Sequence, residues 1–158
     1  GKPSPLGMCI KNGIIYGDYM TSYSVMAVKK DGTIYTPAQG LMGKNLLAAG
    51  VKDTYNFGPV LIKDGEAQLP WAETEKYYPR TAVGMVKPND YVLLVTDTGS
   101  YNGLNHWDMV NIFKSYGCTY AYNLDGGGSA TLYFNGKVMN KLIGNTQRPC
   151  ADFLYFTR

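Results

Sequence analysis

Short runs of apolar residues alternate with turn signals along most of the chain, which predicts a fold rich in β-hairpins. Residues that favour strands flank four two-residue turn signals: Asn12-Gly13, Asp31-Gly32, Asp64-Gly65 and Asn135-Gly136. A type I′ turn needs positive φ at both central residues, and Asn, Asp and Gly tolerate this conformation best. We therefore expect a hairpin at each pair. A fifth hairpin is expected over residues 81–97, with its turn around Pro88-Asn89-Asp90.

Three further segments have the pattern of strands. The run Val92–Val95 is apolar throughout, which is typical of a central strand buried on both faces. Residues 119–124 predict a strand that ends at a glycine-rich loop. Residues 151–158 predict a strand that closes the sheet.

Helical periodicity is limited to two segments. Residues 104–116 carry a broad apolar stripe at helical spacing, with Asn102 or Asn105 as the cap and Gly117 at the end. A second, short helix is expected at 44–49. Hairpins with one or two packed helices predict an α+β fold, built on an antiparallel-rich mixed sheet. We expect residues 1–158 to form a single domain.

The composition is that of a folded globular protein. The 158 residues are 45% hydrophobic and 17% charged, which excludes a disordered chain. The net charge is +3 and the longest basic run is Lys29-Lys30, so a nucleic-acid partner is not expected. No apolar run approaches the ~18 residues of a membrane span. The 14 tyrosines suit half-buried strands, and tyrosine also lines clefts for polar ligands.

The three cysteines, Cys9, Cys118 and Cys150, are sparse and odd in number. They do not form a disulfide scaffold, and no pair has the CxxC spacing of a zinc site. We expect small buried side chains, with one disulfide as the alternative. The sequence leaves the oligomeric state open.

The segment 123–129, Asn-Leu-Asp-Gly-Gly-Gly-Ser, is the strongest candidate for a ligand site. Alternation along a strand would place Asn123 and Asp125 on one face. The amides of Gly126–Gly128 can turn toward a common point, and such a concavity favours anions. The hydroxyl of Ser129 would add a donor. The segment matches neither GxxxxGK[ST] nor GxGxxG, so it is not a known nucleotide loop.

Residues 123–140 resemble the signature of the phosphodiester glycosidase domain family. Four other segments are similar to family motifs in the same order along the chain: 56–67 (Gly-Pro-x-Leu-x-x-x-Gly), 79–85 (Pro-Arg-Thr-Ala-x-Gly), 91–134 (core strand, acid, helix and glycine loop) and 148–156 (Arg-x-x-x-x-x-Leu). The resemblance covers most of the chain and is strongest from residue 56 onward.

The resemblance implies a hydrolase that splits the C1–O bond of a sugar-1-phosphodiester in a glycan or envelope polysaccharide. The family includes the enzyme that removes N-acetylglucosamine from a phosphodiester to expose mannose 6-phosphate, and many bacterial relatives. It implies a secreted bacterial glycosidase of carbohydrate metabolism, located outside the cell or in its envelope. No cofactor, nucleic acid or membrane span is implied for this chain.

Two features depart from the family pattern. An Asn-Gly-Gly-Phe-like strand usually precedes the region where this chain begins, so we expect the domain to lack its first strand. The family stretch Asp-Gly-Arg is Asp97-Thr98-Gly99 here. Because the arginine is absent, substrate preference need not be inherited.

The leaving group of the implied reaction sets the roles of the site residues. A phosphate monoester has a second pKa near ~6 and departs without strong acid help, unlike the alcohol in an ordinary glycosidase. The site therefore needs charge stabilisation more than a carboxylate pair. We expect Asp125 and Asp97 to be catalytic, activating water or stabilising an oxocarbenium-like state. The expected substrate-binding residues are Arg80, Thr81, Asn123, Gly126, Gly127, Gly128, Ser129 and Arg148, with guanidinium groups pairing with phosphate.

Several alternatives stay open. Asp97, Asn123 and Asp125 would be the ligands if a Ca²⁺ or Mg²⁺ ion were bound, although the positions fail the calcium-loop pattern. Glu73 and Glu75 fit a solvated strand face better than a catalytic pair, and a lone His106 fits a structural role. Two other functions fit the sequence: a non-catalytic module that binds sugar or phosphate in the envelope, and a metal-dependent phosphodiesterase.

Overall fold

The computed structural model describes residues 4–19, 21–69, 76–97 and 102–156. The helices within these ranges are α1 (Gly43–Ala48) and α2 (His106–Ser115), and 3₁₀ turns span Gly127–Ser129 and Ile143–Asn145. The strands are β1 (Cys9–Lys11), β2 (Ile14–Gly17), β3 (Ser24–Lys29), β4 (Ile34–Tyr35), β5 (Val51–Phe57), β6 (Val60–Lys63), β7 (Glu66–Ala67), β8 (Thr81–Lys87), β9 (Asp90–Val95), β10 (Tyr120–Leu124), β11 (Tyr133–Phe134) and β12 (Lys137–Val138). The α+β class is confirmed.

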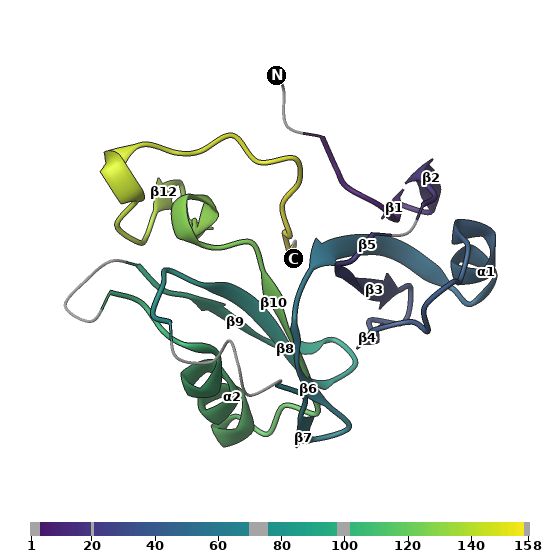
Figure 1. The fold of residues 1–158 in the computed structure, drawn as a ribbon, viewed down its shortest axis with the longest axis horizontal. Helices are drawn as coiled ribbons and strands as arrows, with labels where there is room; N and C mark the ends of the chain where they lie inside the picture. The colour runs from purple at the N-terminus through teal and green to yellow at the C-terminus, as the bar shows by residue number, and fades with distance from the viewer. Residues whose placement is uncertain (1–3, 20, 70–75, 98–101, 157–158) are drawn as a thin grey trace.

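The strands form two main sheets with one helix beside each (Figure 1). The larger sheet has the order β7-β6-β10-β8-β9, and the smaller has the order β4-β3-β5. The hairpins β1–β2 and β11–β12 stand apart as two-stranded units. Every strand pair among the described residues is antiparallel. The expected mixed sheet is therefore wholly antiparallel here.

Three apolar clusters hold the layers together. In the first, Met26 of the smaller sheet packs with Tyr122 of the larger one. In the second, Ala121 on the opposite face of the larger sheet packs with Phe113 of α2. The third joins β1, α1 and the smaller sheet around Leu46. The order of layers is thus α1 with β1–β2, the smaller sheet, the larger sheet, and α2.

Strand β10 occupies the centre of this arrangement. Tyr120 and Tyr122 contact the cluster between the two sheets, whereas Ala121 contacts the cluster under α2. The alternation of side chains along a strand then places Asn123 on the side of α2. Both faces of β10 are covered, so its residues are almost all buried.

Two strand predictions are wrong. The run Val92–Val95 lies in β9, which is an edge strand, and Leu93 is 48% exposed. The strand that is covered on both faces is β10, in the middle of the sheet. Residues 151–156 form no strand. They are held by side chains such as Leu154, which packs on the cluster between the sheets, rather than by a ladder of backbone hydrogen bonds.

The hairpin predictions are confirmed in position. Asn12, Asp64 and Asn135 have φ values of 51°, 53° and 47°, and each precedes a glycine with positive φ, as a type I′ turn requires. The turn at Asp31-Gly32 differs, because only the glycine has positive φ and the amide of Lys29 donates to the carbonyl of Thr33 at 2.9 Å. That geometry is a longer loop with glycine at its left-handed position.

The helix predictions are also confirmed, with small shifts of the ends. Asn105 is the cap of α2: its side chain accepts from the Asp108 amide, and the Asp108 side chain accepts from the Asn105 amide. This reciprocal pair is a capping box. Gly117 follows the helix with φ of 74°. The short helix begins at Gly43 rather than at residue 44.

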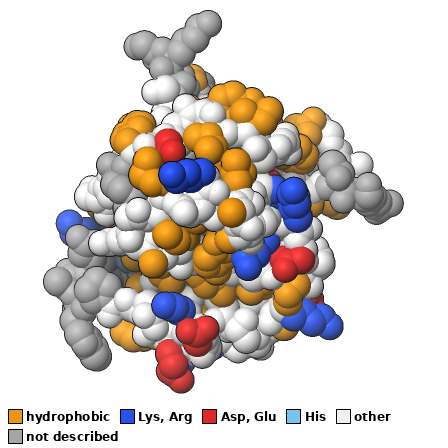
Figure 2. All heavy atoms as spheres, turned by 90° about the vertical axis from the view of Figure 1, so that its right-hand side faces the viewer, with side chains coloured by type: hydrophobic (Ala, Val, Ile, Leu, Met, Phe, Trp, Pro, Cys, Tyr) orange, Lys and Arg blue, Asp and Glu red, His pale blue; other side chains and the backbone are white. Residues whose placement is uncertain are grey.

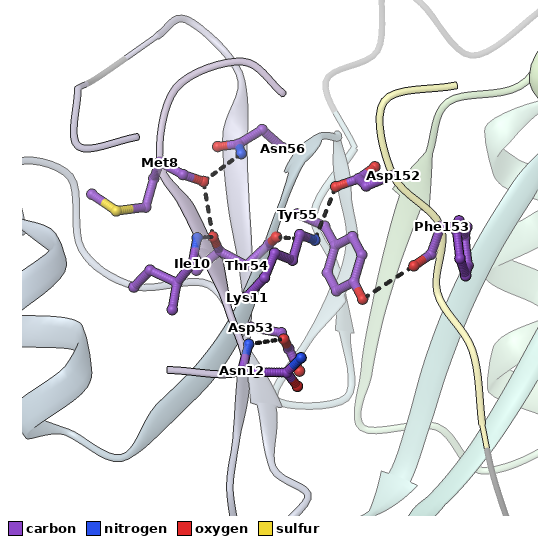
Figure 3. A network of polar contacts seen from close by, with 10 residues as sticks. All are labelled: Met8, Ile10, Lys11, Asn12, Asp53, Thr54, Tyr55, Asn56, Asp152 and Phe153. Carbon is purple, nitrogen blue, oxygen red and sulfur yellow. Dashed lines mark hydrogen bonds and ion pairs between the residues drawn. The ribbon is translucent and has the colours of Figure 1, made fainter. Parts of the chain in front are cut away.

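A polar network ties the C-terminal segment to the smaller sheet (Figure 3). The Lys11 ammonium donates to the carbonyl of Thr54 at 2.9 Å, pairs with the Asp152 carboxylate at 2.9 Å and lies 3.5 Å from the centre of the Tyr55 ring. The Tyr55 hydroxyl donates to the carbonyl of Phe153 at 3.5 Å. These contacts hold Asp152 and Phe153 against β1 and the smaller sheet.

The surface carries charges of both signs. On the face made by the smaller sheet and α1, basic and acidic side chains are interspersed with apolar ones, without a continuous basic stripe (Figure 2). None of the described helices is long and apolar enough to cross a membrane. All three cysteines are free thiols: Cys9 and Cys118 are buried, as expected, but Cys150 is exposed.

Candidate active site

Sheet pairing brings the predicted site residues to one end of the larger sheet. Leu124, the last residue of β10, pairs with Thr81 of β8, and Thr81 pairs with Val95 of β9. The backbone ladder continues one step further, because the amide of Thr96 donates to the carbonyl of Arg80 at 2.9 Å. The start of β8 therefore lies between the ends of β9 and β10.

A cavity of about 490 Å³ opens at this end, where the larger sheet meets the smaller one. We call it the junction cavity. Arg80, His106 and Asn123 contribute its polar wall on the side of the larger sheet and α2. Tyr23 and Phe57, from the ends of β3 and β5, contribute an aromatic wall.

Arg80 is a fixed cation in this cavity. Its Nε donates to the carbonyl of Leu104 at 3.1 Å and its Nη2 donates to the carbonyl of Lys76 at 3.0 Å. The ring of Tyr78 lies 5.2 Å from its Cζ. Burial lowers the pKa of Arg80, but a guanidinium stays charged in proteins. Within the described ranges no carboxylate pairs with Arg80.

Asn123 lines the same cavity with a buried side-chain amide. The residue is 1% exposed, and its Nδ2 donates to the carbonyl of Gly58 at 2.7 Å. That bond fixes the orientation of the amide, whose Oδ1 has no hydrogen-bond partner among the described residues. A buried acceptor without a partner costs free energy, and a ligand donor would remove that cost. Thr81 Oγ1 is likewise buried and unpartnered within the described part of the chain.

The glycine loop is organised by its own acid. Asp125 lies one residue beyond β10, where its Oδ1 accepts from the Gly126 amide at 2.9 Å and its Oδ2 accepts from the Ser129 hydroxyl at 2.7 Å. The Arg148 Nη2 lies 3.9 Å from the same Oδ2. The structure therefore brings Asp125, Ser129 and Arg148 together in an exposed cluster. Asn123, by contrast, is buried.

The loop amides do not converge on one point. The Gly127 amide donates to the carbonyl of Pro79 at 2.8 Å, and the Gly126 amide is taken by Asp125. A Cβ on Gly126 would lie 2.5 Å from that same Pro79 carbonyl, so glycine is needed there for close packing. The Ser129 hydroxyl already donates to Asp125, so only the Gly128 amide remains of the predicted cradle in this conformation.

Asp97 lies in a different cavity, of about 690 Å³, between the end of β9, the start of α2 and the β11–β12 hairpin. Its Oδ2 accepts from the Lys141 amide at 2.7 Å, and Asp108 lines the same cavity. The two predicted catalytic carboxylates thus lie in different places. Asp125 belongs to the glycine loop, and Asp97 lines the cavity beside the β11–β12 hairpin. Thr98, Gly99, Glu73 and Glu75 lie outside the described residues.

The described residues contain no group of three or more His, Cys, Asp or Glu side chains able to hold a metal ion. Asp97 lines one cavity and Asn123 lines the other, and an ion held by Asp97, Asn123 and Asp125 stays a prediction. The carboxylate of Asp125 is engaged by Ser129 and Gly126.

Of the residues that line the junction cavity, the sequence predicted only Arg80 and Asn123 as site residues; His106, Tyr23 and Phe57 are among those it missed. His106 was expected to be structural, yet it is the buried first residue of α2 in the cavity wall. The sequence could have indicated this position, because His106 directly follows Asn105, a predicted cap of the helix. Tyr23 and Phe57 carried no signal, because isolated aromatic residues are ordinary in strands.

The chain is similar to several known proteins. A family model described as phosphodiester glycosidase matches residues 1–157. The chain is 31% identical to the SPbeta prophage-derived uncharacterized protein YomE of Bacillus subtilis, over 94% of this chain and 25% of that protein. It is 28% identical to the mouse N-acetylglucosamine-1-phosphodiester alpha-N-acetylglucosaminidase, over 82% of this chain and 29% of the enzyme.

Two solved structures share the fold. The catalytic domain of the zebrafish N-acetylglucosamine-1-phosphodiester alpha-N-acetylglucosaminidase, auto-inhibited by its pro-peptide, superimposes with a TM-score of 0.70 at 22% identity, over 93% of this chain and 55% of that one. A hypothetical protein from Synechocystis gives 0.51 at 16% identity, over 78% of this chain and 32% of that one. The chain thus spans only part of each relative. Because the family model covers nearly every residue, the chain belongs to the phosphodiester glycosidase family.

Proposed function

We propose that this chain is a hydrolase that cleaves the C1–O bond of a sugar-1-phosphodiester. The observation that carries the proposal is Arg80: a half-buried guanidinium in a cavity wall, oriented by two carbonyls and paired with no carboxylate within the described residues. Such a group binds phosphate bidentately and stabilises charge that develops on it. Membership of the family supplies the reaction class.

The proposed chemistry needs little acid catalysis. Cleavage at C1 releases a phosphate monoester, whose second pKa is near ~6, and Arg80 would stabilise the negative charge as the bond breaks. Asp125 and Asp97 remain the proposed catalytic carboxylates, which would activate water or stabilise an oxocarbenium-like state. Arg148 and Ser129 remain the proposed secondary phosphate contacts. The substrate would be a glycan or envelope polysaccharide, which fits a location outside the cell or in its envelope.

An isotope experiment tests which bond breaks. The methyl diester of N-acetylglucosamine 1-phosphate is incubated with the protein in ¹⁸O water, and the released phosphate monoester is examined by ³¹P NMR. An unlabelled phosphate means C–O cleavage, as we propose. Label in the phosphate means P–O cleavage and would overturn the proposal in favour of a phosphodiesterase. The phosphate is the better readout because the anomeric hydroxyl of the free sugar exchanges with water.

Substitution of Arg80 tests the residue that carries the proposal. Arg80→Gln should lower kcat/KM strongly, because one charge-assisted phosphate interaction is lost. Arg148→Gln is the matched control: its guanidinium is exposed beside Asp125, so a smaller loss is expected. Binding of the diester without turnover by the wild-type protein would indicate a non-catalytic module instead.

A further inference from the structure

An aromatic pair forms one wall of the junction cavity. The rings of Tyr23 and Phe57 are stacked, with centroids 5.8 Å apart and planes 8° apart. Both residues line the cavity with Arg80 and Asn123. Tyr23 remains 45% exposed although Phe57 covers one of its faces. Much of the residue therefore remains exposed beside the cavity.

The pair is held in place by a buried tyrosine. The hydroxyl of Tyr122 accepts from the Phe57 amide at 2.8 Å and donates to the carbonyl of Ser24 at 2.6 Å. Ser24 and Phe57 are also partners across β3 and β5. The Tyr122 hydroxyl thus fixes the backbone at Phe57 and at Ser24, the residue next to Tyr23. A surface set in advance in this way loses little conformational entropy when a ligand binds.

The cavity combines surfaces of three kinds. Arg80 supplies a positive charge, Asn123 supplies a fixed unpartnered acceptor, and the aromatic pair supplies an apolar wall. A sugar ring matches the last two, because it has an apolar C–H surface and a rim of O–H or N–H donors. Ligand sites typically combine an apolar lining with a few placed polar groups.

We propose that the junction cavity contains a sugar subsite. The Tyr23–Phe57 pair packs against the C–H surface of the sugar, and Asn123 Oδ1 accepts a hydrogen bond from a sugar hydroxyl or acetamido N–H. This inference rests on the proposed function, because a phosphate bound at Arg80 would determine where the attached sugar lies in the cavity. It makes Tyr23 a specificity-determining residue and assigns the unpartnered oxygen of Asn123 to the ligand.

The first test measures binding, so that it does not depend on turnover. N-acetylglucosamine 1-phosphate and inorganic phosphate are titrated into the wild-type protein and into Tyr23→Ala by calorimetry. We expect Tyr23→Ala to weaken the sugar phosphate about tenfold, equivalent to ~1.4 kcal/mol, and to leave inorganic phosphate unchanged. Tyr23→Phe should bind as the wild type does. Tyr16→Ala, at an exposed position on β2 that does not line the cavity, is the control.

The second test isolates the Asn123 acceptor. The wild-type protein and Asn123→Ala are titrated with analogues of the sugar phosphate that each lack one donor. For the wild type, removal of one donor should weaken binding about tenfold or more, because the buried acceptor is left unpaired. Asn123→Ala should be indifferent to that same removal, a coupling that a merely structural role would not produce.

The outcomes separate this inference from the proposed function. Equal affinities of Tyr23→Ala and the wild type for the sugar phosphate, or equal donor dependence with and without Asn123, would overturn the subsite even if the diester is hydrolysed. If Tyr23 and Asn123 affect binding as expected but no diester is cleaved, the subsite stands and the proposed hydrolysis fails.

Discussion

Asn123 and Gly58 are joined by two hydrogen bonds. The Asn123 side chain donates to the Gly58 carbonyl at 2.7 Å, and the Gly58 amide donates to the Asn123 carbonyl at 3.0 Å. Gly58 lies between β5 of the smaller sheet and β6 of the larger one. The end of the central strand is therefore fixed to the segment that links the two sheets, and the orientation of the Asn123 amide depends on that segment.

Gly58→Ala should disturb this link. Gly58 has φ of 93°, and a Cβ there would lie 2.3 Å from Ser24 Oγ. We expect a loss of about 1–3 kcal/mol in unfolding free energy together with a raised KM. Gly65→Ala is the matched control, because Gly65 has φ of 80° but no atom within 4 Å of a Cβ. Urea unfolding and kinetics compare the two; equal KM values would show that the link does not position the site.

Gly126→Ala should damage the glycine loop, and Gly128→Ala should not. A Cβ on Gly126 would lie 2.5 Å from the Pro79 carbonyl, whereas the nearest atom to a Cβ on Gly128 is Arg148 Cδ at 3.5 Å, an ordinary contact. Because Pro79 precedes Arg80, the first change should displace the cation as well. We expect Gly126→Ala to lower kcat/KM by about tenfold or more. Indistinguishable kinetics of the two variants would contradict this view of the loop.

Asp125→Asn should abolish most activity while the fold persists. Its contacts with Gly126, Ser129 and Arg148 all lie within an exposed cluster, so little of the core depends on them. A catalytic acid or base typically contributes about 10²–10⁴-fold, and we expect a loss of kcat in that range. Asp64→Asn controls for the charge change, because Asp64 lies in a distant hairpin turn that Asn tolerates. Full turnover by Asp125→Asn would remove it from the mechanism.

Stability should fall at alkaline pH because of the buried tyrosines. Burial raises the pKa of Tyr120 and Tyr122 above the ordinary value. The folded state then holds protons that the unfolded chain releases above pH ~10, so stability present below that pH is lost as pH rises. Tyr120→Phe should make the decline shallower, as measured by urea midpoints between about pH 8 and 11. Tyr16→Phe is the control, and a slope unchanged by Tyr120→Phe would refute the linkage.

The elements that the sequence predicts well are those with local causes. The turns at Asn12 and Asn135 and the cap at Asn105 depend on residues within a few positions of one another. The position of Val92–Val95 in the sheet has no such local cause. Whether a strand is central or at an edge depends on which distant strands pair with it. An apolar run suits burial on both faces, but β9 is an edge strand, paired only with β8, and its residues are only partly buried or exposed.

The residues of the candidate site also fall into those that the sequence could predict and those that it could not. The glycine loop and Arg80 could be found because their residue types are unusual in their context and match a family motif. The aromatic pair could not be found, because Tyr23 and Phe57 meet only through the pairing of β3 with β5. The hydrogen bond from the Gly127 amide to the carbonyl of Pro79 could not be predicted either, because it depends on how the start of β8 lies beside the end of β10.

The segment from Phe57 to Val60 links the sheets and also lines the junction cavity. Domains open locally in cooperative units before they unfold completely. A partly open form in which the smaller sheet has separated would keep Arg80 in place but lose Tyr23 and the support of Asn123. Ligand occupancy would then favour the fully closed domain, so bound substrate would stabilise the boundary between the two sheets.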